Sequence, residues 1–170
     1  MVTLNLAYTA PINPAGASPV LTQAQVWEGL KLKVRRAQDF VPVILDCKVL
    51  SEETLPTGNL KVTREVQFAA HMNPDDKVKP VTERCVHYAP TCVVFEQEDG
   101  SSVINVVSHG PGGEGDLMMT YVFEWRYPVV EAGSVEAKEL GEKHLKMAKM
   151  AVEGSIDTIR RFVKDGKIQS

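Results

Sequence analysis

Four polar residues stand among apolar neighbours, where their side chains could do chemistry: Arg64, Arg84, Tyr121 and His144. A guanidinium that faces an apolar interior could polarise a carbonyl group or stabilise an enolate, and a phenol or an imidazole could relay a proton. Arginine is rarely buried without a partner. The two arginines therefore either face a ligand or are satisfied by carbonyl groups and by carboxylates such as Glu83. Tyrosine and histidine are also common as hydrogen-bonded core residues.

The alternation of apolar and polar residues decides which of these side chains face inward. In residues 59–69 one face carries the arginine among apolar residues: Leu60, Val62, Arg64, Val66 and Phe68. In residues 117–127 the face that carries Tyr121 also carries Met119, Phe123 and Trp125. Because successive side chains of a strand point to opposite faces, both sets are predicted to face the core.

Turn lengths extend this assignment to the strands between these two. A two-residue turn at residues 99–100 places Phe95 opposite Ile104 and Val93 opposite Val106. The apolar residues then share one face, which is predicted to be the inner face.

The glycine-rich turn gives a matching register. If it is centred on residues 113–114, Ile104 meets Phe123 and Val106 meets Tyr121. The same centre pairs Ser108 with Met119, so the apolar sets of the two strands agree.

The turn at residues 89–90 leaves two registers open. With two residues in the turn, Val86 lies opposite Val93 and Arg84 lies opposite Phe95, so both Val86 and Arg84 point inward. A slip of one residue reverses every side chain of a strand. With one more residue in the turn, Arg84 points outward and a carboxylate, a thiol and an imidazole point inward: Glu83, Cys85 and His87.

A long helical pattern at residues 133–163 supplies the opposite wall. At about 100° per residue, one stripe faces the sheet: Leu140, His144, Ala148, Ala151, Val152, Ser155, Ile159 and Phe162. The middle of this stripe is small, because Ala148, Ala151 and Ser155 do not fill the space that a curved sheet encloses. Either large sheet residues reach across to the helix or a cavity remains, and such a cavity is typical of a ligand site.

The residues predicted to line this ligand site come from both walls. They are Tyr8, Val62, Val66, Val86, Phe95, Ile104, Val106, Met119, Phe123, Ala148, Ala151 and Ser155.

The elements that must position these residues follow a simple order. Residues 2–9 alternate as a strand, and Thr22 followed by Gln25 is a capping box for a helix over residues 23–36. A short helical turn over residues 37–40 follows. Six further strands are predicted at residues 44–51, 59–69, 79–88, 91–98, 102–109 and 117–127. Turn residues separate them, among them MNPDD at residues 72–76.

This order predicts an α+β domain over residues 1–170, in which a seven-stranded curved antiparallel sheet wraps around the long C-terminal helix. Two short helices follow the first strand. The order and the stretches LTQAQVWEGLKLKVRRAQDFVPVI and MMTYVFEW resemble the START-like (SRPBCC) helix-grip superfamily, and more narrowly its AtaL-like group, which is associated with secondary-metabolite clusters. The superfamily includes lipid carriers, plant ligand-binding proteins, polyketide cyclases and dehydratases.

Composition excludes several other classes. Hydrophobic residues make up 44% and charged residues 24% of the 170 residues, which is the balance of a globular protein. With a net charge of -3 the chain lacks the basic excess of a nucleic-acid-binding protein. No signal-peptide pattern or membrane-spanning run is found, so a cytoplasmic protein is expected. A homo-oligomer is compatible with the sequence.

Two patterns resemble cofactor-binding motifs, but their sequence context does not predict a bound cofactor or metal. GPGGEG at residues 110–115 matches the letters of a dinucleotide-binding loop, but a strand follows it where that loop needs a helix. Cys85, His87 and Cys92 are close in sequence, but no second pair has ligand spacing, so no metal site is predicted.

The predicted function is the cofactor-free handling of an apolar small molecule. The resemblance implies a polyketide or peptide-derived intermediate, which the protein would cyclise, dehydrate or isomerise. Arg64 and Arg84 would stabilise an enolate, while Tyr121 or His144 would relay a proton. Two alternatives remain open: a non-catalytic carrier with the same cavity, and a protein whose interior is filled.

Overall fold

The computed structural model describes residues 1–70 and 78–169. The predicted turn at residues 72–76 lies outside the described residues. The elements, in chain order, are β1 (Val2–Pro11), α1 (Gln23–Arg35), the 3-10 helix η1 (Ala37–Asp39), β2 (Ile44–Thr54), β3 (Leu60–Phe68), β4 (Lys79–Tyr88), β5 (Cys92–Gln97), β6 (Ser102–His109), β7 (Leu117–Tyr127) and α2 (Val135–Lys164).

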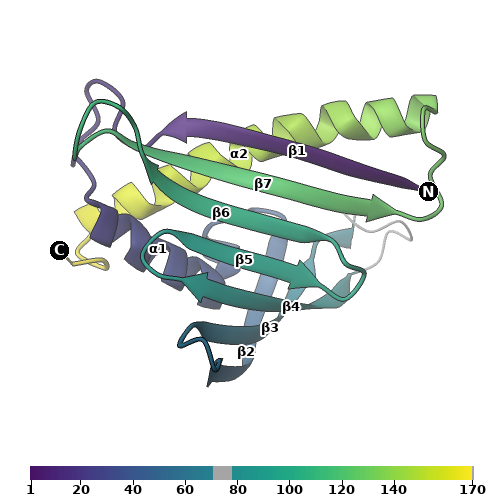
Figure 1. Ribbon diagram of the computed structural model, residues 1–170, viewed down its shortest axis with the longest axis horizontal. Helices are drawn as coiled ribbons and strands as arrows, with labels where there is room; N and C mark the ends of the chain where they lie inside the picture. The colour runs from purple at the N-terminus through teal and green to yellow at the C-terminus, as the bar shows by residue number, and fades with distance from the viewer. Residues whose placement is uncertain (71–77, 170) are drawn as a thin grey trace.

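The strands form one antiparallel seven-stranded sheet in the order β1-β7-β6-β5-β4-β3-β2. The sheet curves, and the long helix α2 runs along the half that contains β1 and β7, while α1 lies against the other half (Figure 1). This is the predicted helix-grip arrangement. Within the described ranges, no helix is long and apolar enough to cross a membrane.

The start of α1 follows the predicted capping box. The Oγ1 of Thr22 accepts a hydrogen bond from the backbone N–H of Gln25 at 3.2 Å, and the Oε1 of Gln25 accepts one from the N–H of Thr22 at 3.0 Å. These bonds satisfy two donors that a helix start otherwise leaves free. The buried residues of α1 recur at helical spacing, including Val26, Leu30 and Lys33.

The helices α1 and α2 pack closely at Gly29. A Cβ atom on this residue would lie 2.7 Å from Cδ1 of Ile159 and closer still to its Cγ1. Ile159 is fully buried. The absence of a side chain at residue 29 therefore sets how near α1 comes to α2, and with it the position of every side chain that α1 turns toward the sheet.

The predicted registers of two hairpins, and the two-residue alternative for the turn after β4, were wrong by one residue. In the structure Phe95 pairs with Val103 and Cys85, and Tyr121 pairs with Asn105. The reason is that each turn contains an odd number of residues. The turn after β5, for example, has Gly100 at φ 83°, the left-handed position of a turn with one residue more than predicted.

Consequently four predicted inward residues lie on the face turned away from the helices. Arg84 is exposed, and the other three are only half-buried: Val86, Ile104 and Val106. The longer turn after β4, which was the open alternative, is the one observed. The assignment of Phe95 survives because the errors in two successive turns cancel, and its side chain is buried as predicted.

Candidate functional site

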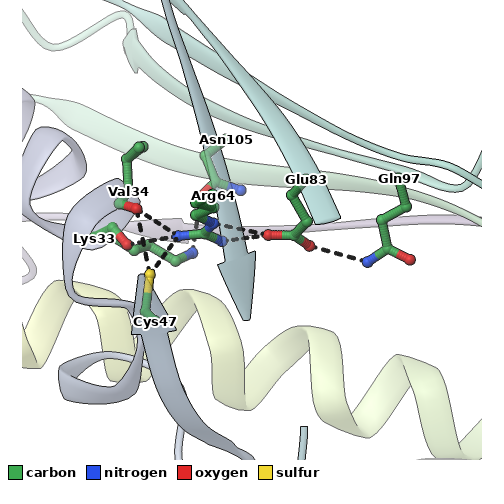
Figure 2. A network of polar contacts seen from close by, with 7 residues as sticks. All are labelled: Lys33, Val34, Cys47, Arg64, Glu83, Gln97 and Asn105. Atoms are coloured by element: carbon green, nitrogen blue, oxygen red, sulfur yellow. Dashed lines mark hydrogen bonds and ion pairs between the residues drawn. The ribbon is translucent and has the colours of Figure 1, made fainter. Parts of the chain in front are cut away.

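The guanidinium of Arg64 lies at the centre of a buried polar network (Figure 2). Its Nε and Nη2 donate to Oε2 of Glu83 at 2.9 and 2.6 Å. Its Nη1 donates to the carbonyl oxygens of Lys33 and Val34, each at 2.9 Å. Arg64 therefore faces inward as predicted, but a carboxylate and two carbonyl groups satisfy it, and it fastens the last turn of α1 to β3 and β4.

The inward residues of β4 do not form the carboxylate–imidazole pair that the longer turn suggested. Glu83 is held by Arg64 and accepts a further hydrogen bond from Nε2 of Gln97 at 3.0 Å. His87 instead contacts the carbonyl oxygen of Leu60 through Nδ1 at 3.2 Å. Burial raises the pKa of the Cys85 thiol between them to about 12, so this thiol is not a thiolate near neutral pH.

A lysine that the sequence reasoning missed lies beside this network. The Nζ of Lys33 donates to Oδ1 of Asn105 at 2.8 Å and to Oη of Tyr121 at 2.9 Å. It also lies 4.1 Å from the centre of the Tyr121 ring and 5.8 Å from that of Phe95. An ammonium ion is attracted to aromatic faces, but neither oxygen partner carries a charge.

The electrostatics of the site favour the neutral amine. Lys33 is 6% exposed, and burial together with the neighbouring Arg64 guanidinium lowers the pKa of its ammonium group to about 7. Burial also raises the pKa of the Tyr121 hydroxyl, which therefore stays protonated and able to donate. An amine that is partly neutral thus lies next to a proton donor.

One polar atom at this place, Nδ2 of the fully buried Asn105, has no hydrogen-bond partner among the residues that the structure describes. The Oδ1 of the same side chain accepts a hydrogen bond from the amine of Lys33. The hydroxyl of Ser155 on α2, which is also buried, lies within hydrogen-bonding reach of the Tyr121 hydroxyl. Buried polar groups are normally hydrogen-bonded, so a buried donor without a partner is a feature that a polar group of a ligand would explain.

Two sequence signals point to these missed residues. Lys33 follows Val26 and Leu30 at helical spacing, so it lies on the buried stripe of α1 although it is charged. Asn105 lies on the inner face of β6 and was assigned to the outer face only because of the one-residue error in register. We call four residues the "lysine cluster": Lys33, Asn105, Tyr121 and Ser155.

His144 lies elsewhere. Its Nε2 is hydrogen-bonded to the hydroxyl of Tyr127, and its ring lies 4.0 Å from that of Trp125. Burial, with a smaller contribution from Lys143, lowers the pKa of His144 to about 4. Trp125 is four residues, or roughly 13 Å along a strand, from Tyr121. Arg64 and Tyr121 therefore both contact Lys33, whereas His144 lies in a different part of the interior.

Nine of the predicted lining residues lie between the sheet and the helices, six on the inner face of the sheet and three on α2. Seven are buried, namely Val62, Val66, Phe95, Met119, Phe123, Ala148 and Ser155, and two are half-buried, namely Tyr8 and Ala151. Tyr121 lies next to Ser155, in the small middle of the α2 stripe. At this point a large sheet residue reaches across to the helix, which is the first of the two alternatives for the small stripe.

A groove of about 470 Å³ opens at the surface between α2 and the loop that follows β1. Its lining includes the small residues Ala10 and Ala15, and Glu153 and Ile156 of α2. Ala10 is the register partner of Met119, and Ile156 is the neighbour of Ser155. The groove therefore borders the part of α2 that carries Ser155 of the lysine cluster.

Comparison with known proteins identifies a family. A family model described as "AtaL: Acetylaranotin biosynthesis cluster protein L" matches residues 6–166. The acetylaranotin biosynthesis cluster protein L of Aspergillus terreus (strain NIH 2624 / FGSC A1156) is 29% identical over 167 residues, covering 98% of this chain and 94% of that protein.

Solved structures share the fold at low sequence identity. The di-domain ARO/CYC BexL from the BE-7585A biosynthetic pathway has a TM-score of 0.63 at 14% identity, and 92% of this chain covers 50% of it. A START superfamily protein from Mycobacterium smegmatis has a TM-score of 0.60 at 11% identity over 91% of this chain and 98% of that chain. This chain therefore spans about half of the di-domain protein and nearly all of the START protein.

Proposed function

Because the chain belongs to the AtaL family of biosynthesis cluster proteins, we propose that it binds an apolar biosynthetic intermediate that carries a carbonyl group and promotes its cyclisation, dehydration or isomerisation. The intermediate would be a polyketide or a peptide-derived compound. No cofactor is needed for such a step, because it requires only proton transfer and the stabilisation of an enolate or a leaving hydroxyl group.

The observation that carries this proposal is the lysine cluster with its unused donor. The Nδ2 of Asn105 is buried and without a partner among the described residues, and the Oδ1 of the same side chain accepts a hydrogen bond from the amine of Lys33. A carbonyl oxygen placed there would accept from Asn105 and Tyr121, as an oxyanion does in acyl transfer.

The surroundings suit the rest of such a molecule. Phe95, Met119 and Phe123 are buried on the same face of the sheet. A reactive chain that is folded against these surfaces loses water and conformational freedom before it reacts, and both losses lower the barrier to ring closure. Arg64 acts as a positioning residue, because it holds the last turn of α1, on which Lys33 lies.

The surface groove supports a route for entry. Met119 has an unbranched side chain that adapts easily, and it is the strand partner of Ala10, which lines the groove. Displacement of Met119 and Ile156 would connect the groove with the lysine cluster.

Deleting the gene from its host tests the proposal. We expect the end product to disappear and an uncyclised or still hydrated carbonyl compound to accumulate, and we expect the purified protein to convert that compound over many turnovers. An unchanged metabolite profile, together with no binding of any accumulated compound, would contradict the proposal. Stoichiometric binding without conversion would instead establish the carrier function.

A further inference from the structure

We propose that Lys33 is a covalent catalytic residue, whose Nζ forms a Schiff base with an aldehyde or ketone group of the bound molecule. This inference deepens the proposed function and rests on it. The observations behind it are the burial of Lys33, its neutral hydrogen-bond partners and its position near the rings of Tyr121 and Phe95.

The hydrogen bonds of Lys33 distinguish it from a structural lysine. A buried ammonium group is normally paired with a carboxylate. The buried carboxylate of this region, Glu83, is bound by Arg64 and Gln97, whereas the amine of Lys33 contacts an amide oxygen and a phenol. Arg64 thus places a second positive charge near the amine and takes the hydrogen bonds of the Glu83 carboxylate, whose opposing effect on the amine is smaller than that of Arg64. This arrangement favours the amine form that attacks a carbonyl carbon.

The proposed step balances with the groups present. The lone pair of Nζ forms a bond to the carbonyl carbon, and the electron pair of the C=O bond moves to oxygen, which takes the proton of the Tyr121 hydroxyl. A proton from the nitrogen returns to the Tyr121 oxygen, and a neutral carbinolamine results. One proton from solvent then helps its hydroxyl group to leave as water, and the nitrogen lone pair forms the C=N bond of a protonated Schiff base.

The same surroundings stabilise that product. The iminium group carries the positive charge that an ammonium group would carry, and it lies over the Tyr121 ring with Phe95 nearby. Its N–H can donate to Oδ1 of Asn105, which already accepts from Nζ at 2.8 Å. A carbon next to an iminium group loses a proton easily, so this intermediate would supply the carbanion that ring closure or dehydration needs.

Reductive trapping tests the inference with a simple probe. The native protein is incubated with decanal and sodium cyanoborohydride at about pH 7.5, and peptide mapping by mass spectrometry locates the alkylated lysines. An ordinary lysine keeps only about a thousandth of its amine free at this pH. We therefore expect Lys33 to react about ten-fold faster or more than Lys31, a half-buried lysine on the same helix that is paired with Glu28.

The pH dependence gives a second readout. The reaction at Lys33 should level off above about pH 7, where burial places the pKa of its ammonium group, whereas reaction at ordinary lysines keeps rising toward about pH 10. In concentrated urea the two lysines should react equally. Reaction at Lys33 that is no faster than at Lys31 in the native protein, or a preference that persists in urea, would overturn the inference.

Variants separate this inference from the proposed function. Lys33→Met should abolish labelling at residue 33, Tyr121→Phe should slow it about ten-fold or more because the ring stays but the proton donor is lost, and Lys31→Met should leave it unchanged. If the Lys33→Met protein still converts the accumulated intermediate, the covalent role is wrong and the proposed function stands. If Lys33 of the native protein is labelled but the intermediate is neither bound nor converted, the proposed function is wrong. The labelling of the native protein needs no variant, so a Lys33→Met protein that fails to fold does not remove the test.

Discussion

At the scale of single residues, Arg64 joins three segments of the chain through one guanidinium. It binds Glu83 on β4 and the carbonyl oxygens of Lys33 and Val34 in the last turn of α1. The sequence left open whether this arginine faces a ligand or is satisfied by carbonyl groups and by a carboxylate such as Glu83, and the structure shows the second alternative. The choice depends on the register of β4, which the sequence also left open.

Replacing Arg64 with methionine should destabilise the protein by about 3–5 kcal/mol, because Glu83 would remain buried without its cation. Urea unfolding measures this change. The matched control is Arg35→Met, which breaks a partly exposed ion pair with Glu52 and should cost no more than about 1 kcal/mol. The double variant Arg64→Met/Glu83→Leu should lose less than the sum of its single variants. Equal losses for Arg64→Met and Arg35→Met would contradict the described network.

His144 should make stability depend on pH in a predictable direction. Burial lowers its pKa in the folded protein to about 4, whereas an unfolded chain has a histidine pKa of about 6.5. The unfolded state therefore binds the proton first, so the contribution of His144 is complete above about pH 6.5 and is lost as the pH falls toward 4, on the order of 3 kcal/mol in all.

Urea unfolding at a series of pH values checks this prediction. The His144→Gln protein should show a shallower loss of stability between pH 6.5 and 4 than the wild type. His87→Gln is the comparison, because burial also lowers the pKa of His87, so that variant should keep the part of the slope that comes from His144. Identical slopes for wild type and His144→Gln would show that His144 is not the group responsible.

At the scale of elements, the contact between α1 and α2 depends on Gly29. The change Gly29→Ala gains helix propensity of about 1 kcal/mol, but the new methyl group meets three atoms of the buried Ile159. Overpacking of this kind costs about 1–3 kcal/mol. We expect a net loss of stability and a displaced α1, measured as a lower melting temperature and weaker trapping at Lys33.

The control for this change lies in α2. A Cβ atom on Gly154 would meet no atom within 4 Å. Gly154→Ala should therefore raise the melting temperature, since it gains the helix propensity without a clash. A melting temperature that rises equally in both variants would contradict the close approach at Gly29.

The elements themselves were predictable because their signals are local. The capping box at Thr22, the alternation of β3 and the stripe of α2 need only neighbouring residues, and the structure confirms each of them. The registers were not predictable, because Asp99-Gly100 suits a turn of either length and only the packed sheet selects one. The prediction of the candidate site failed for this reason, because Asn105 lies on the inner face of the sheet and Arg84 on the outer face, opposite to the prediction.

At the scale of the whole molecule, the groove beside α2 predicts where ligands enter. Ala15 lies in its wall, and Val20 lies in the same loop but is not part of the lining. Ala15→Trp should narrow the groove and slow the alkylation of Lys33 by decanal several-fold, relative to that of Lys31. Val20→Trp should not, because Val20 is exposed and does not line the groove. Equal rates in the two variants would place the entrance elsewhere.

The contact of each tryptophan ring with a histidine ring has a practical consequence. The chain has two tryptophans, and each lies against a histidine: Trp27 of α1 is 6.0 Å from His87, and Trp125 of β7 is 4.0 Å from His144. The emission of an indole responds to the charge and position of a ring beside it. In proteins that keep only one tryptophan, the fluorescence of Trp27 would therefore report movement of α1 relative to β4, and that of Trp125 would report the protonation of His144.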